Sequence, residues 1–137
     1  MANTYNVQLS NLPDRTVRPR TNGVTMVMDK GISLRQSEDF VNSCGEYVAF
    51  LKLGFGTSVI SKNVKEKVKL FKDAGMKVYV GGTLFEAFVV RNKFDDYVKY
   101  ISDLGLDCAE VSDGSIELAH EKKCEYISKL AKNFTVL

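Results

Sequence analysis

The sequence predicts an α/β protein built from parallel βα units. Four times, a short apolar segment of strand length ends in a polar loop marked by glycine and leads into an amphipathic segment. A glycine also separates helix from strand after Ala74 and after Leu104, which is typical of the short returns in βαβ crossovers. Both prolines precede the first unit, so we expect an irregular lead-in over residues 1–22 and one βα domain over residues 23–137.

The strands are expected where apolar residues follow one another, because parallel strands are buried on both faces. Four such runs cover residues 24–28, 47–53, 77–80 and 107–111. A fifth apolar run, residues 134–137, is interpreted as the start of another strand.

Amphipathic segments between these strands are expected to form helices with one apolar stripe facing the sheet. In residues 62–74, Val64, Val68 and Phe71 share such a stripe, and Gly75 follows as a C-cap. Three further helices are expected: one ending at Gly45, one over residues 93–104 and one over residues 117–132.

Pattern alone leaves two parallel architectures open. A closed eight-stranded barrel takes about 250 residues. The 137 residues of this chain provide four complete βα units plus the start of a fifth strand. The expected fold is therefore half of a TIM-type (β/α)8 barrel, with a flavodoxin-like open sheet as the alternative.

Composition narrows the class of protein. A formal net charge of +2, with lysines alternating with acids along helices, gives no basis for a nucleic-acid partner. No apolar run approaches the roughly 20 residues that cross a membrane, and the first 12 residues lack the apolar segment of a signal peptide. The three cysteines show no metal-ligand spacing, so we expect reduced thiols in a cytoplasmic protein.

Ligands of parallel α/β proteins bind beyond the carboxyl ends of the strands, which directs attention to Lys52. This lysine interrupts the apolar strand 47–53 one residue before its loop. Burial lowers the pKa of a lysine towards the range useful for proton transfer, which makes Lys52 the candidate catalytic residue. The alternative is a lysine whose ammonium reaches the solvent at the rim, and we favour the catalytic interpretation.

Four acids lie at the same ends of the expected strands: Asp29, Glu86, Glu110 and Asp113. Together they would form an all-oxygen site suited to Mg²⁺ rather than to zinc or copper. For Asp29 and Lys30, a helix-capping turn with a solvated ion pair is an equally good interpretation. A capping acid is the corresponding alternative for Glu86.

Two glycine-marked loops could bind an anion. Gly54-Phe55-Gly56-Thr57-Ser58 lacks the third glycine and the later acid of a dinucleotide fingerprint, but its amides and hydroxyls, including those of Thr57 and Ser58, could hold a phosphate or sulfonate. In Gly81-Gly82-Thr83 the glycines allow a close approach of the backbone to a ligand, and a tight turn is the alternative.

Taken together and in order, these segments resemble the phosphosulfolactate synthase family. The resemblance rests on four groups of residues: Arg18-Pro-Arg20 with Gly23-Val-Thr-Met-Val-Met-Asp-Lys-Gly31, Phe50-Leu-Lys-Leu-Gly-Phe-Gly-Thr-Ser58, Gly81-Gly-Thr-Leu-Phe-Glu86 and Glu110-Val-Ser-Asp-Gly114. It extends from about residue 18 to residue 137. The sequence departs from the family pattern at Phe55, Val80 and Ser115, where tryptophan, proline and threonine are expected.

The resemblance implies a (β/α)8 barrel that adds sulfite to phosphoenolpyruvate, with Mg²⁺, to give (2R)-phospho-3-sulfolactate. Lys52 would be the acid or the cation that polarises the substrate carboxylate, and Asp29, Glu86 and Glu110 would be metal-ligand candidates. Substrate and sulfite would be held by Arg18, Arg20, Lys30, Thr57, Ser58 and the amides of Gly82 and Thr83.

The expected half barrel affects both activity and assembly. The family continues past the fifth strand, so we expect this chain to form an incomplete site with little activity alone. The rival hypothesis is a non-catalytic half-barrel scaffold. Because open strand edges and an apolar interior favour association, both hypotheses predict self-association, as a homodimer or a larger assembly.

Overall fold

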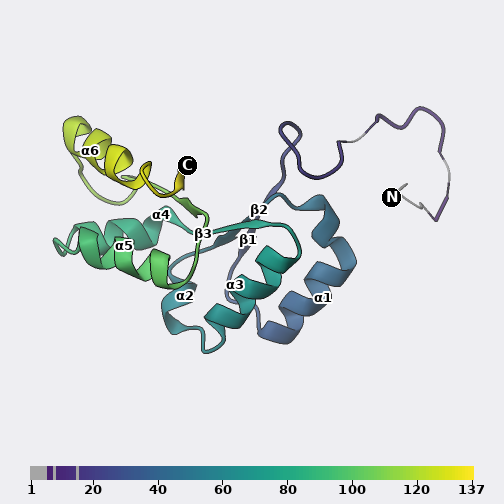
Figure 1. The fold of residues 1–137 in the computed structure, drawn as a ribbon, viewed down its shortest axis with the longest axis horizontal. Helices are drawn as coiled ribbons and strands as arrows, with labels where there is room; N and C mark the ends of the chain where they lie inside the picture. Colours follow the sequence, from purple (N-terminus) through teal and green to yellow (C-terminus); the bar gives the residue numbers. More distant parts are fainter. Residues whose placement is uncertain (1–5, 8, 15) are drawn as a thin grey trace.

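A computed structural model of the 137-residue chain describes residues 6–7, 9–14 and 16–137 (Figure 1). Residues 1–5, 8 and 15, which belong to the expected lead-in, lie outside the described residues. The strands are β1 (Met26–Asp29), β2 (Phe50–Leu53), β3 (Lys77–Val80), β4 (Cys108–Ala109) and β5 (Thr135–Val136). The helices are α1 (Leu34–Cys44), the 3₁₀ turn η1 (Gly45–Tyr47), α2 (Thr57–Ile60), α3 (Val64–Asp73), α4 (Gly82–Val89), α5 (Phe94–Asp103) and α6 (His120–Leu130).

The strands follow one another across the sheet in the order of the sequence. β2 pairs in parallel with both β1 and β3, and β4 pairs in parallel with β5. The amide of Asp107 donates to the carbonyl of Val78 at 3.2 Å, which places the β4–β5 pair beside β3. In a flavodoxin-like sheet the first strand lies between the second and the third. The flavodoxin-like alternative is therefore wrong, because β2 occupies the middle position.

Alternate side chains of the sheet point to two different environments. Leu51, Leu53, Val78 and Val80 are buried, and α1 and α3 lie side by side along this face (Figure 1). On the opposite face of β1, Met26 is 56% exposed and Met28 is 40% exposed. The sheet thus has one face covered by helices and one face that is open at β1. We call the latter the open face.

Aromatic side chains join the last three helices. Phe85 of α4 lies edge-on to Tyr97 of α5 and Tyr126 of α6, with ring centroids 5.5 and 5.6 Å apart. Phe94 and Tyr126 have centroids 4.5 Å apart. The two edge-to-face pairs of Phe85 contribute to stability beyond the area that they bury.

No helix of the described chain is both long and apolar enough to cross a membrane.

The expected strands and helices agree with the structure except near their ends and at two loops, of which the one from Gly54 contains the short helix α2 (Thr57–Ile60). β2 begins only at Phe50, because residues 45–47 form η1. The segment expected to be a loop from Gly81 onward is helix α4 from Gly82. Its apolar residues lie too close together to show a helical stripe, and its first turn contains glycine, which is unfavourable in helices.

Candidate active site at the carboxyl ends of the strands

Lys52 and Glu110 form an ion pair on the open face. The ammonium of Lys52 lies 2.7 Å from Oε2 of Glu110 and 2.9 Å from its Oε1. The two side chains are 20% and 22% exposed, so the pair is partly shielded from water but remains accessible. Because Lys52 is the last residue but one of β2 and Glu110 follows β4, the pair crosses over β3, where the Lys52 nitrogen is 6.0 Å from the Tyr79 ring centroid.

Two glycines leave room for this pair. A Cβ atom on Gly81 would lie 2.7 Å from Cε of Lys52. A Cβ atom on Gly82 would lie 2.3 Å from Cβ of Ser112 and 3.0 Å from Oε1 of Glu110. Side chains at these two positions would therefore collide with the site. The groups that the Gly81-Gly82 backbone approaches in the structure are the protein's own Lys52, Ser112 and Glu110, and the predicted approach to a ligand stays a prediction.

Glu86 organises the loop that follows β4. Its side chain comes from α4 and is buried, and its Oε1 accepts hydrogen bonds from the hydroxyl of Ser112 and from the amide of Gly114 at 2.9 Å. Its Oε2 accepts from the amide of Ser115 at 3.1 Å. Burial alone would raise the pKa of Glu86, but the hydrogen bonds from Ser112, Gly114 and Ser115 outweigh burial and lower it. The carboxylate is therefore ionised and its acceptors are occupied.

Tyr79 remains a neutral hydrogen-bond donor beneath the ion pair. Burial, with contributions from the charges of Glu110 and Cys108, raises the pKa of Tyr79 to about 12. Its hydroxyl lies 2.7 Å from the sulfur of Met26. The site thus contains the Lys52 cation on β2, the protonated Tyr79 phenol on β3 and the Glu110 carboxylate directly after β4.

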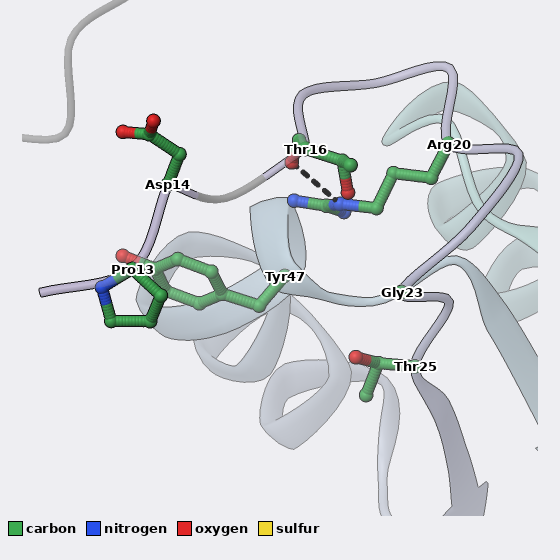
Figure 2. Close-up of a pocket in the computed structure, with 7 residues that line it drawn as sticks. All are labelled: Pro13, Asp14, Thr16, Arg20, Gly23, Thr25 and Tyr47. Carbon is green, nitrogen blue, oxygen red and sulfur yellow. Dashed lines mark hydrogen bonds between the residues drawn. The ribbon is translucent and has the colours of Figure 1, made fainter.

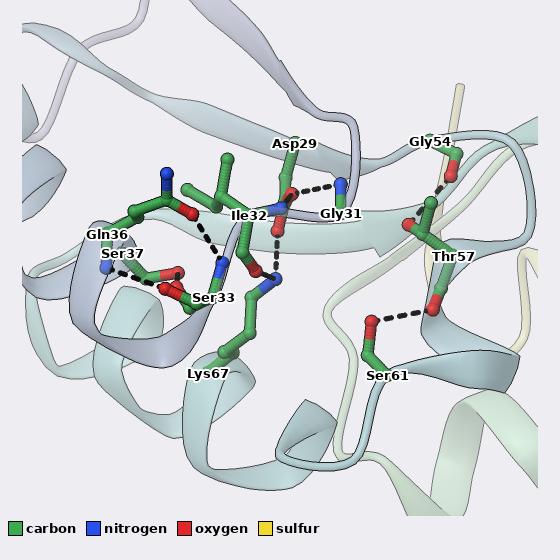
Figure 3. Close-up of polar contacts among 10 residues, drawn as sticks. All are labelled: Asp29, Gly31, Ile32, Ser33, Gln36, Ser37, Gly54, Thr57, Ser61 and Lys67. Carbon is green, nitrogen blue, oxygen red and sulfur yellow. Dashed lines mark hydrogen bonds and ion pairs between the residues drawn. The ribbon is translucent and has the colours of Figure 1, made fainter.

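Asp29 lies on the opposite, helix-covered side, in a buried ion pair with Lys67 of α3 (Figure 3). The two charged atoms are 2.5 Å apart and the side chains are 1% and 3% exposed, respectively. Oδ1 of Asp29 accepts from the amides of Gly31 and Ile32 at 2.7 and 2.8 Å, and Lys67 donates to the carbonyl of Ile32 at 2.6 Å. Both partners therefore bind the β1–α1 loop, and we call this group the Asp29–Lys67 clamp.

The other predicted binding residues occupy the loops around this edge. Lys30 is exposed beside the clamp, Thr83 is exposed in the first turn of α4, and Ser58 is buried in α2. Thr57 donates from its hydroxyl to the carbonyl of Gly54 at 2.8 Å. These residues share the carboxyl side of the sheet with Lys52.

Arg18 and Arg20 lie at the opposite, amino ends of the strands. The guanidinium of Arg18 donates to the carbonyls of Gly45, Val48 and Ala74. Arg20 donates to the carbonyls of Thr16 at 3.0 Å and Glu46 at 2.9 Å, beside a pocket of about 340 Å³ that Tyr47 also lines (Figure 2). The structure does not bring these arginines to Lys52 and instead gives them contacts that anchor the lead-in.

The four carboxylates predicted to hold Mg²⁺ do not converge. Asp29 is bound by Lys67, Glu86 by its loop donors and Glu110 by Lys52, and Asp113 pairs with Lys123 at 2.6 Å. Among the described residues, no group of three or more His, Cys, Asp or Glu side chains is arranged to hold a metal ion. In this arrangement the four acids do not fit a common Mg²⁺ site.

Two side chains that contact predicted site residues, Lys67 and Ser112, were not identified from the sequence. Lys67 falls on the inward stripe of α3 between Val64 and Phe71, and this lysine on an apolar face was the available signal. Ser112 contacts both Glu86 and the Gly82 position, and no pattern in the sequence marks that contact.

Breaking the Asp29–Lys67 clamp should destabilise the fold strongly. Lys67→Met leaves a buried carboxylate without its cation, which we expect to cost about 3–5 kcal/mol in urea unfolding. The double variant Asp29→Asn/Lys67→Met should lose less, because no charge is then buried. Lys69→Met is the control, since the Lys69–Asp73 pair is 75% and 63% exposed. Equal losses for Lys67→Met and Lys69→Met would contradict the clamp.

The lowered pKa of Glu86 predicts a pH-dependent contribution to stability. A carboxyl with a lowered folded-state pKa stabilises the protein above its unfolded value, 4.5, and loses that contribution as the pH falls through the folded value. Urea unfolding should therefore show wild type more stable than Glu86→Gln at pH 7, with a difference that shrinks below pH 4.5. The exposed Glu117→Gln is the control. A difference independent of pH would contradict the ionised, hydrogen-bonded carboxylate.

Comparison with known proteins places this sequence in a family. The family model for (2R)-phospho-3-sulfolactate synthase (ComA) matches residues 13–137. The chain is 43% identical over 118 residues to a phosphosulfolactate synthase of Methanocaldococcus jannaschii, covering 84% of this chain and 47% of the relative. It is 32% identical over 126 residues to a phosphosulfolactate synthase of Bacillus subtilis, covering 92% and 50%.

A plant protein also matches. The chain is 29% identical over 128 residues to the protein HEAT-STRESS-ASSOCIATED 32 of Arabidopsis thaliana, covering 88% of this chain and 44% of the relative. The chain thus spans about half the length of the curated relatives that it matches. The family model covers most of the sequence, including all the elements that build the site. The chain therefore belongs to the (2R)-phospho-3-sulfolactate synthase family.

Proposed function

We propose that this chain carries part of a site that adds sulfite to phosphoenolpyruvate to form (2R)-phospho-3-sulfolactate. The observation that supports the proposal most directly is the Lys52 ammonium, which Glu110 holds at 2.7 Å over the open face. The Lys52 ammonium is held in place beside the backbone of Gly81 and Gly82, which have no side chain to block the approach of a ligand. Such a cation suits a substrate with several negative charges.

The proposed reaction is a conjugate addition. The sulfur lone pair of sulfite forms a bond with the methylene carbon of phosphoenolpyruvate. The electron pair of the carbon–carbon double bond then moves towards the carboxylate and produces an aci-carboxylate. Protonation of C2 restores the carboxylate, while the phosphate ester stays intact. No oxidant or reductant is needed.

Lys52 is proposed to act twice in this sequence. Its positive charge stabilises the aci-carboxylate, and its ammonium donates the proton to C2, after which solvent protonates the amine again. Glu110 is a positioning residue that holds the ammonium in place. The amides of Gly82 and Thr83, the hydroxyls of Thr57 and Ser58 and the side chain of Lys30 are proposed to hold the substrate and sulfite.

The proposed half-barrel fold affects how much catalytic activity the 137-residue chain has without further barrel units. Consecutive parallel strands with helices on one face are arranged as in a segment of a (β/α)8 barrel, in which active-site loops come from all eight units. We therefore propose that the 137-residue chain binds substrate but turns it over poorly. The alternative is a scaffold without activity, which would bind no substrate at this edge.

Phosphoenolpyruvate binding and sulfite-dependent turnover test the site. We expect calorimetry to detect phosphoenolpyruvate binding that weakens about tenfold in Lys52→Met, since hydrogen bonds to charged groups contribute roughly 1.5–3 kcal/mol. The exposed Lys132→Met is the control. Equal binding and turnover by wild type and Lys52→Met would contradict the role of Lys52. No binding by the folded wild type would favour the scaffold.

We also propose that the chain self-associates as a homodimer through the open face. Met26 and Met28 are half exposed there, and β1 has no neighbouring strand on its outer side among the described residues. Unpaired parallel edges and apolar surface are normally covered, and a second copy supplies matching strands when this chain is alone in solution.

Light scattering tests the dimer. We expect a mass of twice 15.3 kDa at micromolar concentration, and dissociation to 15.3 kDa in Met26→Glu/Met28→Glu, because charges would then be buried in the interface. Glu117→Gln on the outer surface should leave the mass of the dimer unchanged. A monomeric wild type would refute the proposed association without bearing on the role of Lys52.

A further inference from the structure

We infer that the amino ends of β2 and β3 carry a second binding pocket, which takes a small organic anion with an apolar part. The pocket has a volume of about 340 Å³. Its walls include Arg18, Pro19, Arg20, Phe50, Gly75 and Lys77. None of these residues belongs to the group around Lys52 and Glu86 at the carboxyl ends.

Arg18 is the rigid part of this pocket. Its guanidinium donates to the carbonyls of Gly45, Val48 and Ala74, so neutral acceptors fix its position without cancelling its charge. Gly75 makes this placement possible, because a Cβ there would lie 3.0 Å from Nη1 of Arg18. With a φ of +78°, that position also favours glycine. The result is a positive charge held at the pocket wall.

No carboxylate among the residues that line the pocket balances its positive charge. The wall contains three cations, Arg18, Arg20 and Lys77, and no acid. Among the described residues, no ion pair joins any of the three to a carboxylate. Burial and the neighbouring charge of Arg20 lower the pKa of Arg18, an effect that Glu46 partly offsets. A bound anion would relieve this repulsion.

The apolar part of the ligand follows from the remaining walls. Phe50 and Pro19 line the pocket, and the Lys77 nitrogen lies 5.8 Å from the Phe50 ring centroid. The volume falls in the range of small-molecule sites, about 300–1,000 Å³. A cationic rim with an aromatic wall is complementary to a carboxylate or phosphate carried on a small apolar group.

Titration of the 137-residue chain with benzoate, followed by backbone amide NMR, tests this pocket. We expect saturable shifts at Ala49, Gly75 and Lys77, and about tenfold weaker affinity in Lys77→Met and in Arg20→Met. Acetate should bind more weakly than benzoate, because it lacks the apolar group. Arg18 is left unchanged because its three hydrogen bonds hold the local fold.

Two controls separate this pocket from the proposed active site. Lys52→Met and Lys132→Met should leave the benzoate affinity unchanged. Shifts confined to Gly81 and Gly82, or affinity lost in Lys52→Met alone, would overturn the second pocket while leaving the role of Lys52 intact. Shifts that increase linearly without saturation would overturn it as well. Loss of phosphoenolpyruvate binding in Lys52→Met with unchanged benzoate binding would support both sites independently.

Discussion

The parallel register of β1, β2 and β3 determines on which face of the sheet Lys52 lies. Lys52 is level with Met28 on one side and Tyr79 on the other. Side chains alternate across a strand, so this level faces the open side, while Leu51 and Leu53 face the helices. A shift of one residue would bury the Lys52 ammonium in the apolar layer and separate it from Glu110. The ion pair at the site is thus a consequence of backbone pairing.

The amount that could be predicted from the sequence differed between fold and site. Parallel βα units follow from local patterns, such as Val64, Val68 and Phe71 on one stripe, and the structure contains them. Strand order depends on pairing between distant segments, which no local pattern records. Lys52 stands out in the sequence because an isolated charge in an apolar strand is unusual, whereas no local pattern indicates its ion-pair partner Glu110, which is 58 residues away.

The acids illustrate why residue type and strand end do not suffice to define a site. A carboxylate after a strand can face the open side, as Glu110 does, or the helix layer, as Asp29 does. Asp29 is neutralised by Lys67, and Glu86 is satisfied by the loop after β4. The carboxylates of Asp29 and Glu86 therefore hold loops in place, and the carboxylate that remains partly exposed beside Lys52 is that of Glu110.

Because of the three hydrogen bonds of Arg18, we expect the amino end of the sheet to tolerate inserted residues less well than the carboxyl end. They tie the lead-in to carbonyls at the end of α1, before β2 and at the end of α3. An added residue in either of these helix-to-strand returns would displace a carbonyl from the guanidinium. Residues 116–119, in the loop that leads to α6, make no side-chain hydrogen bond or ion pair with another segment of the described chain, whereas Asp113, Gly114 and Ser115 are bound by Lys123 and Glu86. Changes in length during evolution should therefore accumulate on the carboxyl side, where new specificity can arise without disturbing the framework.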